Sequence, residues 1–146
     1  MRIRSTILLV AVAVASFPAF SSQASLEDLK ARLQNARLDE RAGISLEIAE
    51  RQVGAADKLY KEGKVDEAEA AIRDVVAYAG QAGEATAQTG HRIKSTEIAM
   101  RKMAHRLNDV KRSAPYENQE TLQTAIDSLE KIRTDLLNKM FGKNAK

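Results

Sequence analysis

The sequence contains no cysteine and no tryptophan, and only two prolines in 146 residues. Without cysteine it cannot form disulfides, thiolate metal sites or a thiol nucleophile. Aromatic residues make up 4% of the chain, while alanine supplies much of its apolar content. Because alanine favours helix but buries little area per residue, we expect a helical protein with a thin core, stabilised by packing alone.

The N-terminal segment has the pattern of a cleavable secretion signal. Residues 1–4 are basic, residues 7–15 are an apolar run, and small side chains stand one and three residues before a cut after Ala24. A cut after Ala19 or Ser21 is the alternative. As a membrane anchor the run is too short, because a bilayer core needs about 20 apolar residues. The sequence therefore predicts an exported protein, periplasmic or extracellular, with a signal peptide at residues 1–24 and no integral membrane segment in the mature chain.

Residues 25–146 are predicted to be a single all-α domain. Helical periodicity dominates this region, and no strand-like alternation is convincing. We expect helices at about 26–39, 44–62, 66–113 and 118–141, with Gly43 between the first two. These would pack as elongated antiparallel hairpins in a coiled-coil-like bundle of about four helices.

The segment 66–113 carries a continuous seam of apolar or small residues with alternating steps of three and four. That spacing is the 3.5-residue period of a coiled coil. Glycines near its middle predict either a bend at about 80–90 or a close approach by another helix. The seam residues are Ile72, Val75, Ala79, Ala82, Thr86, Thr89, Ile93, Thr96, Met100, Met103, Leu107, Val110 and Ala114.

Residues 52–80 resemble a single tetratricopeptide-like helical hairpin. The residues that carry the resemblance are Ala56, Leu59, Tyr60, Gly63, Val65, Ala68 and Ile72. The segment departs from the pattern at Gln52, where an aromatic residue is usual, and at Gly80, where a proline is usual. The resemblance implies a peptide-binding hairpin. The alternative is an isolated αα-hairpin, because no second copy follows and such repeats need about three copies for stability.

Basic residues are concentrated in residues 91–112, outside the seam. We expect them to line the outer face of the helix, either as an ordinary solvated face or as a contact for anionic lipid head groups or polysaccharide. Nucleic acid is not an expected partner, because the chain is exported and no aromatics are interleaved for stacking. The candidate anion contacts are Arg92, Lys94, Arg101, Lys102, Arg106, Lys111 and Arg112.

Candidate chemistry is otherwise sparse. Met100, Met103 and His105 suggest a soft-metal site, but both methionines occupy seam positions, where core methionine is ordinary. No spacing assembles a nucleophile with a base, so we expect neither catalysis nor a cofactor. The first hypothesis is a non-enzymatic envelope scaffold or adaptor that offers an Ala-rich groove or seam to a helix of a protein partner or of a second copy. The possible seam residues are Ile93, Met100, Met103, Leu107 and Val110. The alternatives are binding of an anionic envelope surface by helix 91–112, and binding of metal.

Overall fold

The computed structural model describes residues 24–142, and within that range the chain is all-α, without a strand. The predicted signal peptide lies outside the described residues, apart from Ala24. The predicted all-α class is confirmed, with five α-helices where about four were expected. They are α1 (Leu26–Asn35), α2 (Leu38–Lys61), α3 (Val65–Thr89), α4 (Ile93–Ser113) and α5 (Gln119–Phe141), with the 3-10 turn η1 (Tyr116–Asn118) before α5.

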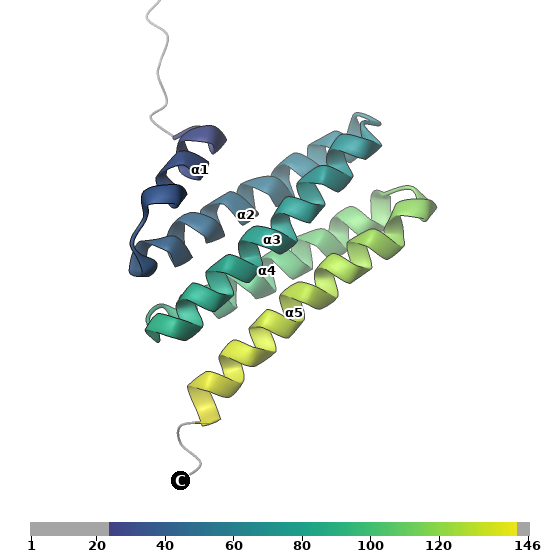
Figure 1. Cartoon of the computed structure of the whole chain (residues 1–146). Helices are drawn as coiled ribbons and strands as arrows, with labels where there is room; N and C mark the ends of the chain where they lie inside the picture. The colour runs from purple at the N-terminus through teal and green to yellow at the C-terminus, as the bar shows by residue number, and fades with distance from the viewer. Residues whose placement is uncertain (1–23, 143–146) are drawn as a thin grey trace, which may run out of the picture.

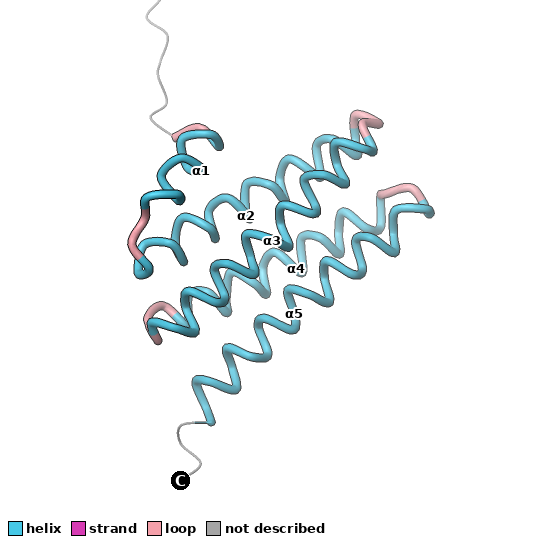
Figure 2. The backbone as a smooth tube through the Cα atoms, in the orientation of Figure 1, coloured by secondary structure: helices cyan, strands magenta, loops and turns pink. Residues whose placement is uncertain are grey.

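Two antiparallel hairpins, α2 with α3 and α4 with α5, form the body of the molecule (Figure 1). Packing is most extensive within each hairpin, and the hairpins meet through α3 with α5 and α2 with α4. Both hairpin turns lie at one end of the bundle, and the connection between α3 and α4 lies at the other end (Figure 2). The short helix α1 packs on α2 near that second end.

The α2–α3 turn forms as the sequence predicts. Gly63 adopts a left-handed backbone with φ 73°, which a glycine tolerates without strain. Its amide donates to the Tyr60 carbonyl at 3.1 Å, and the Lys64 amide donates to the Leu59 carbonyl at 2.9 Å. These bonds satisfy carbonyls at the end of α2 that have no partner within the helix.

The segment 66–113 is not one helix. It breaks at residues 90–92, where Gly90 and Arg92 both have a left-handed backbone, with φ 71° and 61°.

The boundary between the first two helices also differs from its prediction, because α1 ends at Asn35 and Gly43 lies inside α2. A side chain at Gly43 would meet the guanidinium of Arg92, whose Nη1 lies 2.7 Å from the position of an added Cβ. This glycine therefore makes room for a neighbouring side chain rather than ending a helix.

The main core lies between the hairpins and is rich in alanine. Its largest fully buried side chains include Ile72, Met100, Leu107, Leu122 and Leu129. A second, smaller core forms where α1 covers α2. The interior is therefore thin, as the composition predicts, and the helices approach one another closely. The second core consists of Leu29, Ile44 and Ile48, with Leu26, Leu33, Ala36 and Tyr78 packed around them.

Candidate interaction surfaces

The large end of the predicted seam is part of the core of the bundle. Met100 and Leu107 are fully buried, and Met103 and Val110 are nearly so. They share one cluster with side chains of α3 and α5, among them Leu122 and Leu129, whereas Ile93 is half-buried. In this conformation the seam is filled by the chain's own helices and does not present a free surface.

A buried hydrogen bond joins the hairpins at the small end of the seam. The hydroxyls of Thr86 on α3 and Thr96 on α4 lie 3.0 Å apart, and both residues are at most 1% exposed. The next residue, Glu97, is also buried, and its carboxylate accepts from Arg133 Nε of α5 at 2.7 Å. Hydrogen bonds from Arg133 to Glu97 and Glu130 raise the pKa of the guanidinium, so the charge stays in place. These polar groups are satisfied within the chain and leave no open site.

Six of the seven basic residues of 91–112 are exposed and Lys111 is half-buried, but they do not form one strip. The guanidinium of Arg106 lies over Gly54 of α2, with Nη2 3.4 Å from the position of an added Cβ, and Arg92 lies over Gly43 in the same way. Lys111 turns toward α5 and donates to Gln123 at 2.5 Å.

Lys102 faces Glu50 of α2. Partial burial raises the pKa of the Glu50 carboxyl, and the charge of Lys102 opposes that rise.

Three of the predicted contacts do share one exposed line. Lys94, Arg101 and Arg112 are separated by seven and eleven residues. Because successive residues are turned by about 100° around the helix axis, both separations bring the side chain back to nearly the same side of the helix. All three are exposed, as is His105 between them. Arg112 pairs with Asp109 at 3.6 Å, as does His105 at 3.4 Å. The outer face of α4 therefore carries a line of three cations about 27 Å long, from a rise of about 1.5 Å per residue.

The three glycines at the centre of the long segment have three different roles. Gly90 ends α3 with its left-handed backbone. Gly83 marks a close approach, because an added Cβ would lie 2.6 Å from Ile132 Cγ2 of α5. Gly80 meets nothing within 4 Å. The two predicted alternatives, an interruption and a close approach, both occur, at different glycines.

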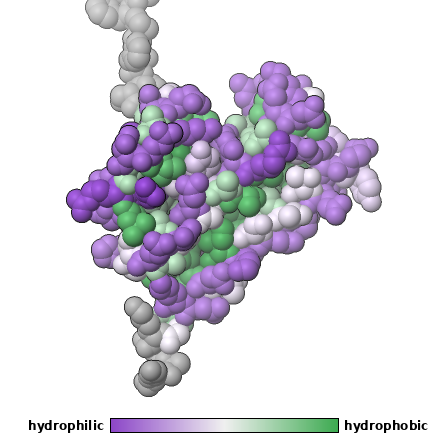
Figure 3. All heavy atoms as spheres, viewed as in Figure 1, coloured by the Kyte–Doolittle hydropathy of each residue, from purple (hydrophilic) through white to green (hydrophobic). Residues whose placement is uncertain are grey.

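Beside Gly80 and Gly83, an open groove runs between α3 and α5. Its volume is about 250 Å³. Figure 3 shows weakly polar and hydrophobic side chains along the face where these helices lie, bordered by hydrophilic ones. At the end of the groove, Lys139 donates to the Ala87 carbonyl. The groove is lined by Gly80, Gly83, Glu84, Ala87, Ile132, Asp135 and Leu136.

No family model, curated protein or solved structure matches this chain. No matched protein therefore supports the resemblance of residues 52–80 to a tetratricopeptide-like hairpin, and only the local geometry of the segment can be compared with that repeat. The segment forms the turn of a hairpin whose helices have 24 and 25 residues, and the span from Leu38 to Thr89 exceeds the roughly 34 residues of one such repeat.

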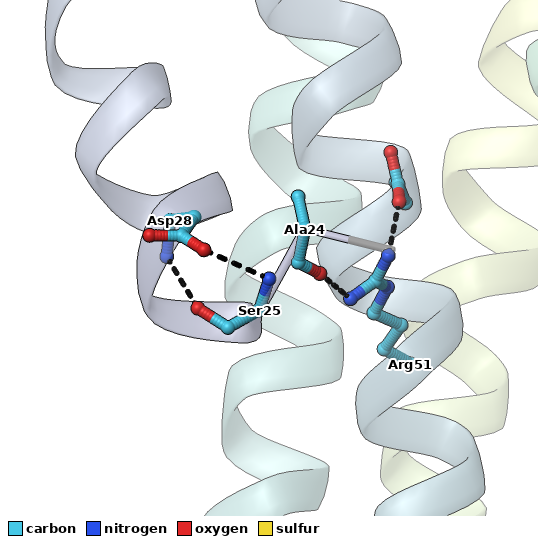
Figure 4. Close-up of polar contacts among 5 residues, drawn as sticks. Ala24, Ser25, Asp28 and Arg51 are labelled. Carbon is cyan, nitrogen blue, oxygen red and sulfur yellow. Dashed lines mark hydrogen bonds and ion pairs between the residues drawn. The ribbon is translucent and has the colours of Figure 1, made fainter. Parts of the chain in front are cut away.

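The start of the described chain is closely bonded to α2 (Figure 4). Ser25 and Asp28 form a reciprocal capping box at the start of α1, with N–O distances of 3.0 and 3.1 Å. The hydrogen bonds to Ser25 lower the pKa of the Asp28 carboxyl. Arg51 donates to the Ala24 carbonyl and to Glu47, the latter at 2.6 Å. A cut after Ala24 would remove only the Ala24 contact and would leave the cap intact.

The described part of the chain brings together no group of three or more metal-ligating His, Asp or Glu residues. The two methionines considered for a soft-metal site are core residues, and His105 is exposed beside Asp109. Among the described helices, none is long and apolar enough to cross a membrane.

The sequence did not predict the α3–α5 groove as such. The only sequence signal for the groove was the pair Gly80 and Gly83, and Ile132, which packs against Gly83, lies about 50 residues away along the chain.

Proposed function

We propose that this protein is a non-enzymatic scaffold or adaptor of the cell envelope that acts through helix–helix contacts. The observation that carries this proposal is the open groove between α3 and α5. Because Gly80 has no side chain, and a Cβ added there would meet no atom of another described element within 4 Å, another helix can approach the backbone of α3 there. Ile132 and Leu136 form the apolar wall of the groove. The envelope location follows from the leader pattern of residues 1–24.

The groove favours a particular kind of partner. Its floor is narrow and made of glycine and alanine, so it suits a helix with small side chains on the contacting face. Its rim carries the acidic Glu84 and Asp135, so basic residues flanking that face would complement it. Asp135 already pairs with Lys131 at 2.9 Å, so a partner would compete with a local lysine and the rim would contribute modestly. We therefore expect apolar packing to supply most of the affinity.

A pull-down from envelope extract with the mature chain as bait tests the proposal. The Gly80→Leu variant should fill the groove and abolish capture of the partner. Ala70→Leu is the matched control, because it adds the same side chain at an exposed position of the same helix. Capture by the wild type should persist at about 0.5 M salt, where exposed charges are largely screened. Equal capture by both variants would contradict the groove as the contact.

The exposed line of Lys94, Arg101 and Arg112 supports a second candidate, binding to anionic envelope lipids. Each cation near a charged bilayer contributes about 1 kcal/mol, so three would contribute about 3 kcal/mol, or roughly a hundredfold in affinity. Replacing all three with glutamine should reduce binding to anionic vesicles by about that factor. The control replaces three exposed lysines of the other hairpin with glutamine, at positions 58, 61 and 64. Equal binding by the two triple variants would contradict this candidate.

A further inference from the structure

We propose that two copies of this chain form a dimer by exchanging hairpins. In this dimer, residues 90–92 straighten and α3 continues directly into α4. The α4–α5 hairpin of each chain then packs on the α2–α3 hairpin of the other. This inference deepens the proposed function, on which it rests, by naming a second copy of the chain as one helix–helix partner.

The first observation is the phase of the seam across the break. From Ile72 to Ala114 the steps alternate three and four without a slip, including the step from Thr89 to Ile93 across residues 90–92. In the compact fold nothing requires this, because α3 and α4 are separate helices whose phases are independent. In one continuous helix the same phase is required, because a single slip would turn half of the seam away from its partner. The sequence thus keeps a pattern that the compact fold does not need.

The second observation is the connection itself. It has three residues, and Arg92 adopts a left-handed backbone that a residue with a Cβ occupies under strain. Short strained hinge loops favour exchange, because the extended form relieves the strain while every other contact is remade. Gly90 opposes this, because glycine is a poor residue inside a continuous helix. Arg92 therefore favours the exchanged dimer, whereas Gly90 favours the compact fold.

The third observation is that each hairpin can separate as a unit. Packing is most extensive within α2–α3 and within α4–α5. The polar contacts between the hairpins are few and local, and each can form equally well between two chains. Among the described residues the hydrogen bonds are Thr86 with Thr96, Asn118 with Glu69 at 2.6 Å, and the Lys139 amine with the Ala87 carbonyl, and Lys102 also faces Glu50 across the hairpins. Exchange therefore replaces these contacts one for one, and the difference between the two states is concentrated in residues 90–92.

Because the chain lacks cysteine, an engineered disulfide can report which chain supplies each hairpin. The Thr86→Cys and Thr96→Cys variants are made separately, refolded together at high concentration and oxidised. In the exchanged dimer, residue 86 of one chain lies beside residue 96 of the other, so the mixture gives a covalent dimer on a non-reducing denaturing gel. In the compact fold, or in a dimer of compact chains, these two residues meet only within one chain. The mixture then gives no 86–96 crosslink, and the proposal is wrong.

Two hinge variants test the direction of the equilibrium by sedimentation. Gly90→Ala destabilises the left-handed turn and favours the continuous helix, so its dimerisation constant should rise about tenfold or more. Arg92→Gly relieves the strain within the compact form, so its constant should fall by a similar factor. Helix content measured by circular dichroism should be unchanged in both, which separates exchange from unfolding. If neither variant shifts the constant, or if both shift it in the same direction, exchange at this hinge is excluded.

The two proposals fail separately. A covalent 86–96 dimer without salt-resistant capture from envelope extract would support exchange and contradict the adaptor. Capture that is lost in Gly80→Leu, together with a wild type that shows no 86–96 crosslink, would support the adaptor and contradict exchange.

Discussion

The contact between Gly83 and Ile132 makes a quantitative prediction about how closely α3 and α5 pack. A Cβ added at Gly83 would lie 2.6 Å from Ile132 Cγ2, a separation at which one of the two helices must shift. Ile132 cannot easily turn away, because a β-branched side chain in a helix has one strongly preferred rotamer. Overpacking of this kind destabilises by about 1–3 kcal/mol, while replacing a helical glycine with alanine gains about 1 kcal/mol. We therefore expect Gly83→Ala to range from neutral to about 2 kcal/mol less stable than the wild type.

The matched control is Gly80→Ala, three residues earlier on the same helix. Its Cβ would meet nothing within 4 Å, so only the gain in helix propensity remains and the protein should become about 1 kcal/mol more stable. The two alanine variants should therefore differ by about 1–3 kcal/mol in the free energy of unfolding. Urea denaturation followed by circular dichroism measures both.

A double-mutant cycle identifies the atom responsible. Ile132→Leu keeps the side-chain volume but removes the γ2 methyl group, and alone it should cost less than about 1.5 kcal/mol. Combined with Gly83→Ala it should restore most of the lost stability, giving a favourable coupling energy. If Gly83→Ala is as stable as Gly80→Ala, or if Ile132→Leu does not rescue it, α3 and α5 do not pack as described.

Three further predictions use other parts of the molecule. Leu107 is fully buried, so Leu107→Ala should lower the free energy of unfolding by about 2–5 kcal/mol. Arg106→Ala on the exposed side should change it by less than about 0.5 kcal/mol. Equal melting temperatures for Leu107→Ala and the wild type would show that the seam is not core. The Tyr60 hydroxyl is buried without a hydrogen bond, so Tyr60→Phe should be about 1 kcal/mol more stable. Burial and nearby Glu69 raise the pKa of Tyr60, so the unfolded chain loses this proton first and wild-type stability should fall above about pH 10. The fall should be smaller in Tyr60→Phe, where raised lysine pKa values such as that of Lys30 still contribute to it, and unchanged in the exposed Tyr116→Phe. Intact mass of the exported protein should correspond to a chain starting at Ser25, and recovery of an uncleaved chain would contradict the predicted signal.

Periodicity predicted the helices well because it depends on local residue spacing. The antiparallel hairpins were also predicted, because short breaks near Gly63 and between residues 113 and 118 separate long helical segments. The break at residues 90–92 was harder to place, because the seam continues in phase across it. No local signal separated a helix that bends at a glycine from two helices that end there.

The surfaces were less predictable because they depend on which helices become neighbours. The basic residues of 91–112 look alike in sequence, but the position of α2 divides them. Arg92 and Arg106 are exposed but lie over glycines of α2, whereas Lys94 and Arg101 lie on the outer line of α4. The same holds for Gly43, whose location inside a helix makes sense only once Arg92 is placed beside it. Sequence spacing fixed the faces of each helix but not what covers them.

The buried pair Thr86 and Thr96 bears on how the hairpins are aligned along their length. An interface rich in alanine is nearly uniform along the helix axis, so a slide of one helical turn, about 5.4 Å, would bring alanine against alanine again. The two hydroxyls are 3.0 Å apart only in the observed alignment. After such a slide both would be buried without a partner, at a cost of about 1–3 kcal/mol each. The threonine pair therefore adds to the close contact of Gly83 with Ile132 in selecting one axial position, which the alanines alone would not specify.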